Sequence, residues 1–281
     1  MTSRRMLLQG VAGAGALLCG LPPTAAQPVA KAARIGILAA VSEPVPWYMS
    51  RVEALRTELR DLGWIEGRNL DIDIRLAGPN PQRLRALAAE LKAAPVALIV
   101  AEGTTPIRAA RDGAPGLPVV MVNAGDPVGA GFVASLARPG GDLTGTSAAG
   151  EEVLAKQVEL LSAAVPQLKR IGVLMNRSNP ANAFFFKAMS ARAASLGLAL
   201  ERIEVGAPAE LDAAVARARG AALVVVSDPM FGQHDARLIE LTLRHRVPAI
   251  FGARTWAVDG GLMSYLSPSD WHWRKAAGFI D

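Results

Sequence analysis

The sequence predicts an α/β protein built from two doubly wound parallel-sheet lobes with a cleft between them. Strand and helix patterns alternate along the chain, and the whole pattern occurs twice. Residues 34–38 read RIGIL and residues 170–174 read RIGVL, and each is followed by an amphipathic segment that ends in Leu-Gly. Alternating strands and helices are typical of a parallel sheet covered on both faces. A length of 281 residues leaves room for two such sheets.

In the first half, a helix is expected to begin at Pro46, because proline is tolerated in an opening turn. Its apolar face would carry Val52, Leu55, Leu59 and Leu62, and Gly63 would end it. Residues 70–76 alternate between apolar and polar, which predicts an edge strand. Residues 96–100 are continuously apolar and are expected at the centre of the sheet, and residues 117–121 form the next strand.

The second half repeats this order. A helix is expected to begin near Pro180, with an apolar face of Phe186, Met189, Ala193 and Leu196, and to end at Gly197. Residues 198–205 follow as a short strand. The apolar run at 221–226 predicts the central strand, and residues 247–251 predict another.

The repeat places the first lobe at residues 31–145 and the second at 146–259, with residues 260–281 returning to complete the first lobe. The run at 137–145 holds three glycines and a proline, so it is the best candidate for a hinge between the lobes; the alternative is a surface turn. Residues 260–265 suggest a strand and 271–281 an amphipathic helix. Because the chain stops directly after this helix, we expect a C-terminal segment to be missing.

The N-terminus has the layout of an export signal. Residues 1–5 are basic, residues 6–21 are mostly apolar, and small residues precede an expected cleavage near Ala26. Residues 1–26 therefore predict a periplasmic protein. The Arg4-Arg5 pair resembles a twin-arginine motif, and the general secretory route is the alternative. Lipid anchoring at Cys19 is not expected, because Leu18 is unsuited to the position before a lipid-bearing cysteine.

Several classes of function are disfavoured. The formal charge is +5, or +3 without the expected signal, and no basic run marks a nucleic-acid surface. The three histidines are scattered and no Cys/His cluster occurs, so no metal site is expected. No Walker-type or dinucleotide-binding glycine pattern is present, so no cofactor is expected. No Gly-x-Ser-x-Gly elbow suggests a catalytic serine, and an enzyme is not expected.

Small polar residues follow the strands at which a ligand would bind, because ligands of parallel sheets bind beyond the carboxyl ends of the strands. The candidate ligand-binding residues are Trp47, Gly103, Thr104, Thr105, Asp126, Asn176, Asn179, Ser227, Asp228 and Tyr265. For any one of the polar residues, helix capping is an alternative explanation. Four polar strand ends at one cleft are better explained by a ligand.

The residue types suggest a zwitterionic ligand. The hydroxyl groups of Thr104 and Thr105 and the adjoining helix start suit a carboxylate, and Asp126 or Asp228 suits an ammonium group. Trp47 is placed to wall the pocket, with core packing as the alternative, and Tyr265 is placed to stack on a ring.

The run at 125–145 (GDPVGAGFVASLARPGGDLTG) resembles the signature of periplasmic substrate-binding proteins of the tryptophan/tyrosine-type ABC transporter family. Matches at 156–161, 176–181, 227–229 and 260–265 extend the resemblance over nearly all of the mature chain. It implies a type I periplasmic-binding fold with three crossovers. It also implies capture of a small solute, often an amino acid, for a membrane permease.

Two departures from the family are visible: relatives continue past the position of Asp281, and Leu266 stands where glycine is common. We expect a monomeric solute-binding protein whose lobes close over the solute. The alternative is a periplasmic sensor domain that presents the solute to a receptor, and an exported hydrolase dependent on Ser227 or Asp228 is a third hypothesis. The identity of the solute stays open.

Overall fold

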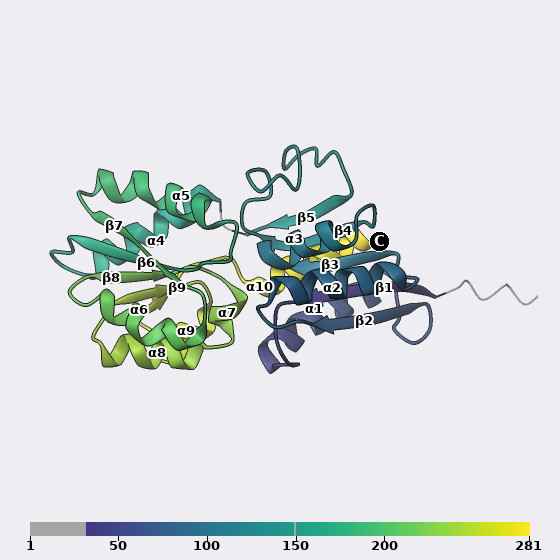
Figure 1. Cartoon of the computed structure of the whole chain (residues 1–281), viewed down its shortest axis with the longest axis horizontal. Coiled ribbons are helices and arrows are strands. Elements are labelled where there is room, and N and C mark those ends of the chain that lie inside the picture. Colours follow the sequence, from purple (N-terminus) through teal and green to yellow (C-terminus); the bar gives the residue numbers. More distant parts are fainter. Residues whose placement is uncertain (1–31, 149) are drawn as a thin grey trace, which may run out of the picture. The chain divides into compact units, whose positions relative to one another are not determined.

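The computed structural model describes residues 32–148 and 150–281 (Figure 1). The expected export signal at residues 1–26, with Cys19, lies outside the described residues. None of the helices in the described part of the chain is long and apolar enough to cross a bilayer.

The first sheet contains five parallel strands in the order β2-β1-β3-β4-β5. These are β1 (Ala33–Ala39), β2 (Leu70–Leu76), β3 (Leu98–Glu102), β4 (Val119–Ala124) and β5 (Leu143–Ser147). One face of the sheet packs against α1 (Pro46–Asp61) and α10 (Ser269–Ile280). The other face packs against α2 (Pro81–Ala93) and α3 (Thr104–Gly113). Helices on both faces make the sheet doubly wound, as predicted.

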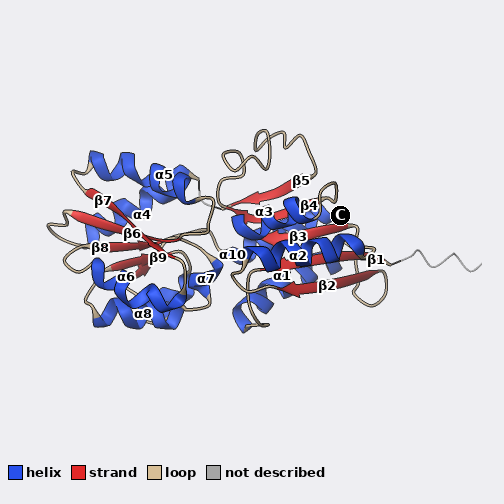
Figure 2. Ribbon diagram, viewed as in Figure 1, coloured by secondary structure: helices blue, strands red, loops and turns tan. Residues whose placement is uncertain are grey.

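The second sheet also contains five parallel strands, in the order β10-β9-β8-β6-β7. These are β6 (Arg170–Asn176), β7 (Ala199–Val205), β8 (Ala222–Val225), β9 (Ala249–Phe251) and β10 (Met263–Ser264). Its longer helices are α4 (Glu151–Ala164), α5 (Asn182–Ser195), α6 (Leu211–Arg217) and α8 (Asp235–Arg244), and the shorter ones are α7 (Pro229–Gly232) and α9 (Arg254–Val258). Figure 2 shows α5 and α8 on opposite faces of this sheet. Two lobes of the predicted fold class are therefore confirmed.

Several elements lie where the sequence predicted them. The alternating segment forms β2 at the edge of the first sheet, over the predicted residues Leu70–Leu76. The two continuously apolar runs form β3 and β8, which are the central strands of their sheets. Helix α1 begins at Pro46, and Gly63 follows it with a φ of 94°, which glycine adopts at little cost.

The prediction that residues 137–145 form the hinge is wrong. Leu143 pairs with Val119 of β4, so the end of this run is already part of β5 in the first sheet, and the residues before it form a largely exposed loop. The surface-turn alternative therefore holds. The expected boundary at 145/146 falls inside β5, and the chain leaves the first sheet only after this strand.

The expected return of residues 260–281 to the first lobe is wrong in its first part. Met263 of β10 pairs with Ile250 of β9, so β10 extends the second sheet. The chain crosses back between β10 and α10, and α10 then packs against α1, β4 and β5. Without β10, β9 would be the edge strand of the second sheet. Its backbone groups on that edge would lack partners, which explains why β10 joins this sheet.

Leu62 and Leu196 do not lie on the buried helix faces that the sequence predicted. They are 46% and 38% exposed, respectively, whereas Val52, Leu55 and Met189 are fully buried. Both leucines follow the last turn of a helix and immediately precede a glycine with positive φ, where the backbone turns away from the sheet. The helical spacing of apolar residues therefore continues to the C-cap residue of each helix, although the buried face ends one turn earlier.

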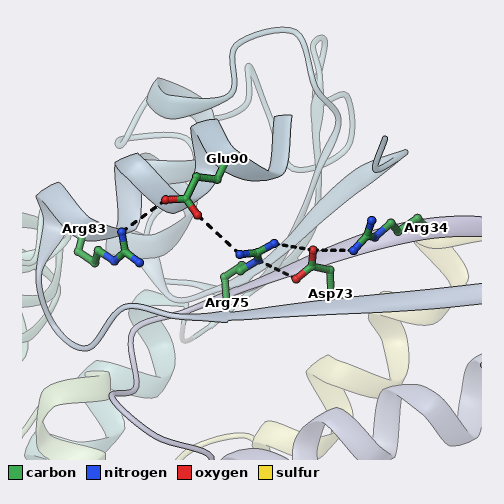
Figure 3. A network of polar contacts seen from close by, with 5 residues as sticks. All are labelled: Arg34, Asp73, Arg75, Arg83 and Glu90. Atoms are coloured by element: carbon green, nitrogen blue, oxygen red, sulfur yellow. Dashed lines mark hydrogen bonds and ion pairs between the residues drawn. The ribbon is translucent and has the colours of Figure 1, made fainter. Parts of the chain in front are cut away.

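An ion-pair network joins the edge strand of the first lobe to its neighbours (Figure 3). Asp73 of β2 accepts hydrogen bonds from Arg34 of β1, at 3.0 Å, and from Arg75 of its own strand, at 2.7 Å. Arg75 lies 3.6 Å from Glu90 of α2, which also pairs with Arg83. The hydrogen bond to Asp73 raises the pKa of Arg75. Charged side chains along an edge strand also oppose pairing with another chain.

Candidate functional site

A pocket lies where the carboxyl ends of strands from both sheets meet. Its wall includes Ala40 and Val41 after β1, and Gly103 after β3. From the second sheet it includes Ser227 after β8 and Gly252 after β9. This is the position in which open parallel sheets bind ligands.

The structure brings seven of the ten predicted residues together in this pocket. They are Trp47, Gly103, Thr104, Thr105, Asn179, Ser227 and Asp228. The first four belong to the first lobe and the last three to the second. A molecule in the pocket would therefore contact both lobes.

The other three predicted residues do not line the pocket. Asp126 caps a turn, because its Oδ1 accepts a hydrogen bond from the Gly129 N–H at 2.8 Å. Tyr265 is 41% exposed, and its carbonyl oxygen accepts a hydrogen bond from Gln157 Nε2 at 2.7 Å. Asn176 is buried behind Asp228. Of the two predicted partners for an ammonium group, only Asp228 lines the pocket.

Asp228 is a buried carboxylate, 8% exposed, at the start of α7. Its Oδ1 accepts hydrogen bonds from Asn176 Nδ2 at 3.0 Å and from the Met230 N–H at 2.9 Å, and its Oδ2 accepts one from Asn179 Nδ2 at 2.8 Å. Burial raises the pKa of Asp228, and these three hydrogen bonds offset the rise only in part. No cation among the described residues contributes to this pKa, so the carboxylate lacks a counter-charge.

The two asparagines are held so that their N–H groups face Asp228. Asn176 Oδ1 accepts hydrogen bonds from the N–H and hydroxyl of Ser178, and Asn179 Oδ1 accepts one from the Ala181 N–H. Each amide oxygen thus accepts hydrogen bonds from nearby residues, and this orients each Nδ2 group to donate to the Asp228 carboxylate. Asn176 therefore supports the site without lining it.

Helix α3 presents its N-terminus to the pocket from the first lobe. Gly103 precedes the helix with a φ of 83° and has no side chain to cap it, and Thr104 and Thr105 begin the first turn. The N–H groups of a first turn have no acceptor within the helix. Thr104 Oγ1 accepts a hydrogen bond from the Gly125 N–H at 3.0 Å, whereas Thr105 Oγ1 is buried and has no partner. This end of the pocket offers donors to an anion.

An ion pair in the pocket wall was not predicted from the sequence. Arg51 Nη1 donates hydrogen bonds to both carboxylate oxygens of Glu102, at 3.0 and 3.2 Å, and the guanidinium carbon of Arg51 lies 4.6 Å from the centre of a Trp47 ring. Two signals were available. Glu102 is a charged residue at the end of an apolar strand, and Arg51 lies one helical turn after Trp47. Phe231 and Trp256 also line the pocket, without a distinctive sequence signal.

Two further lining residues contain buried polar atoms with no hydrogen-bond partner among the described residues. They are the hydroxyl of Tyr48 and Oδ1 of Asn123. Burial, followed by the nearby charge of Glu102, raises the pKa of Tyr48 well above its ordinary value, so the phenol stays protonated. Buried polar atoms without partners are rare and call for an explanation. A bound molecule in this pocket is one.

Two parallel-sheet lobes with a pocket at the carboxyl ends of their strands define the fold class of type I periplasmic binding proteins. A family model described as ABC transporter substrate binding protein matches residues 34–272. The chain belongs to this family, as its sequence signature predicted.

Individual relatives agree with this assignment. A tyrosine-binding protein of Clostridioides difficile is 34% identical over 120 residues, which are 43% of this chain and 34% of that protein. The match thus spans about a third of the length of this curated relative. An ABC domain in complex with L-Trp from Streptococcus pneumonia has a TM-score of 0.81 at 24% identity, covering 89% of this chain and 84% of that one.

A ligand-free, open substrate-binding protein with adhesive properties from Clostridium difficile has a TM-score of 0.60 at 23% identity, covering 88% of this chain and 83% of that one. At these identities the solved structures establish the shared fold.

Proposed function

We propose that this protein is the exported solute-binding component of an ABC uptake transporter, and that its solute is an α-amino acid. The solute would bind in the pocket between the lobes and be delivered to a membrane permease. Residues 1–26 would direct the chain to the periplasm and be removed there. Family membership supports the transport role, and the pocket chemistry supports the class of solute.

The observation that carries the proposal is Asp228. It is a buried carboxylate in the pocket wall to which the described residues supply three hydrogen bonds but no cation. Leaving a charge buried without a counter-charge is costly. A solute ammonium group would provide that charge and bring the pKa of Asp228 down again.

The carboxylate of the solute would bind at the N-terminus of α3. A Cβ added at Gly103 would lie 3.8 Å from Pro229, the residue after Asp228, so the two ends of the site are close to each other across the pocket. The first-turn N–H groups and the Thr105 hydroxyl supply donors. An α-amino acid matches this pair of sites, because it carries an ammonium group and a carboxylate on the same α-carbon.

The names of the relatives point the same way, since one is a tyrosine-binding protein and another is a complex with L-Trp. The aromatic side chains Trp47, Phe231 and Trp256 line the pocket here. We therefore propose an aromatic or large apolar amino acid as the first solute to test.

Isothermal titration calorimetry of the mature protein against the twenty amino acids tests the proposal. The preferred amino acid is then compared with its N-acetyl derivative, which lacks the ammonium group, and with its amide, which lacks the carboxylate. We expect both derivatives to bind far more weakly. Equal binding of the N-acetyl derivative would exclude Asp228 as the ammonium site, and no binding of any amino acid would exclude this class of solute.

Gly125 gives a further prediction about closure of the lobes. A Cβ at this position would lie 2.8 Å from Ala181 Cβ and 2.9 Å from Phe185 Cζ of the second lobe, and 2.7 Å from Thr104 Oγ1. Overpacking of this kind costs about 1–3 kcal/mol, so we expect Gly125→Ala to lower the affinity about tenfold. Gly141→Ala is the control, because nothing lies within 4 Å of its added Cβ. Equal affinities of the two variants would show that Gly125 plays no part in closure.

A further inference from the structure

Gln233 connects the two lobes through its side-chain amide. It follows Gly232 at the end of α7. Its Oε1 accepts a hydrogen bond from the Ser42 N–H at 3.2 Å, and its Nε2 donates one to the Ala40 carbonyl oxygen at 3.1 Å. Nε2 also donates to the Pro229 carbonyl oxygen at 3.2 Å, which fixes the amide to its own helix.

These two hydrogen bonds are distinctive in the structure. Among the hydrogen bonds and ion pairs of residues 32–148 and 150–281, these two alone connect the first lobe with the second. The remaining contacts between the lobes that are described above are apolar, such as those of Gly125 with Ala181 and Phe185.

The chemistry of the amide fits the backbone that it meets. The Ala40 carbonyl and the Ser42 N–H flank Val41, just past the end of β1. Past the end of β1, this carbonyl and this N–H have no neighbouring strand to pair with, so they need other hydrogen-bond partners. A primary amide offers one acceptor and one donor side by side, as the next strand of a sheet would. A carboxylate would provide only the acceptor, and alanine neither.

We propose that Gln233 is a latch that holds the lobes together over the bound solute without contacting it. This proposal rests on the proposed function. Gln233 does not line the pocket, but it is the C-cap of the short helix α7, whose N-cap is Asp228. A solute that draws Asp228 toward α3 therefore brings Gln233 onto the end of β1. The latch raises affinity by stabilising the arrangement in which the solute touches both lobes.

The test compares Gln233→Ala and Gln233→Glu with Gln82→Ala. Gln82 is an exposed glutamine on α2 whose side chain forms no hydrogen bond in the structure, so its replacement is the matched control. Solute affinity is measured by calorimetry and dissociation by stopped flow. Loss of two neutral hydrogen bonds predicts an affinity about 5- to 30-fold lower for Gln233→Ala, mainly through faster dissociation. Gln233→Glu should lose at least as much, because its carboxylate faces the Ala40 carbonyl.

A second measurement needs no solute. Spin labels on one introduced cysteine per lobe report the distance between the lobes in the ligand-free protein, after removal of the segment that contains Cys19. We expect longer and more widely spread distances in both Gln233 variants than in the wild type or Gln82→Ala. Unchanged distances would overturn the latch, whatever the calorimetry shows. If wild-type protein bound no amino acid while the distances changed, the proposed function would fail and the latch would stand.

Discussion

Asp228→Asn is expected to abolish binding of the amino acid, with an affinity at least about 100-fold lower, while the protein keeps its fold. Asparagine has nearly the same shape but no charge to pair with the ammonium group. Its oxygen can still accept from Asn176 and Met230, whereas its NH₂ group would face Asn179 Nδ2. Calorimetry measures the affinity, and circular dichroism verifies the fold.

The control is Asp235→Asn. Asp235 also lines the pocket, but its Oδ1 is engaged by the adjoining Ala236 N–H, and it is not placed to meet the ammonium group in our proposal. We expect this variant to bind within a few-fold of the wild type. If Asp235→Asn lost binding of the amino acid while Asp228→Asn still bound it, the ammonium group would bind Asp235 and our assignment to Asp228 would be wrong.

Because the pKa of Asp228 is raised, the affinity for the amino acid should depend on pH. The solute cation favours the charged carboxylate, so affinity should fall as the pH falls through the pKa of Asp228 in the free protein. Stability of the free protein responds in the opposite sense. The charged form costs stability above the raised pKa, and this cost fades as the pH falls toward the lower, unfolded value. Asp228→Asn should remove the contribution of this residue to both effects.

Trp273→Ala is expected to destabilise the first lobe by about 3–5 kcal/mol, because it removes a fully buried aromatic side chain. The ring of Trp273 on α10 meets the ring of Tyr48 on α1 edge to face, with centroids 5.6 Å apart. An ion pair between Arg274 and Glu58, at 2.7 Å, joins the same two helices at the surface. Urea denaturation followed by far-ultraviolet circular dichroism measures the loss.

Trp271 provides a matched control on the same helix. It is 49% exposed, so Trp271→Ala should change stability by no more than about 0.5 kcal/mol. Trp273→Phe, which keeps most of the apolar surface, should fall between the two. Equal losses for Trp271→Ala and Trp273→Ala would contradict the burial of α10 against α1.

Elements with strong local patterns could be predicted from the sequence. Alternation fixed the bounds of β2, and continuous apolar runs identified β3 and β8 as central strands. Short strands with weak patterns could not be assigned to a sheet. The residues of β5 include Gly145 and two threonines, and β10 has only two residues, so their places depend on pairing with β4 and β9. Such long-range pairing leaves no local signal.

The candidate site shows the same limit. The rule that strand ends followed by helix starts form binding sites selected Thr104, Thr105 and Asp228, which line one pocket. The same rule also selected Asp126, which turned out to cap its own turn, because capping and binding favour the same residue types. Gln233 could not be found, since nothing in its neighbours along the chain indicates that β1 lies opposite.

The position of α10 has a consequence for how the protein forms. This helix covers Tyr48 and the adjoining face of the first sheet, yet it is translated after all of the second sheet. During synthesis, the first sheet is complete at β5, but its apolar face stays uncovered until α10 emerges, after every strand of the second sheet has been made. The lobe that is begun first is thus covered by α10 only after the second sheet has been made, and this uncovered surface is where a chaperone would be most useful.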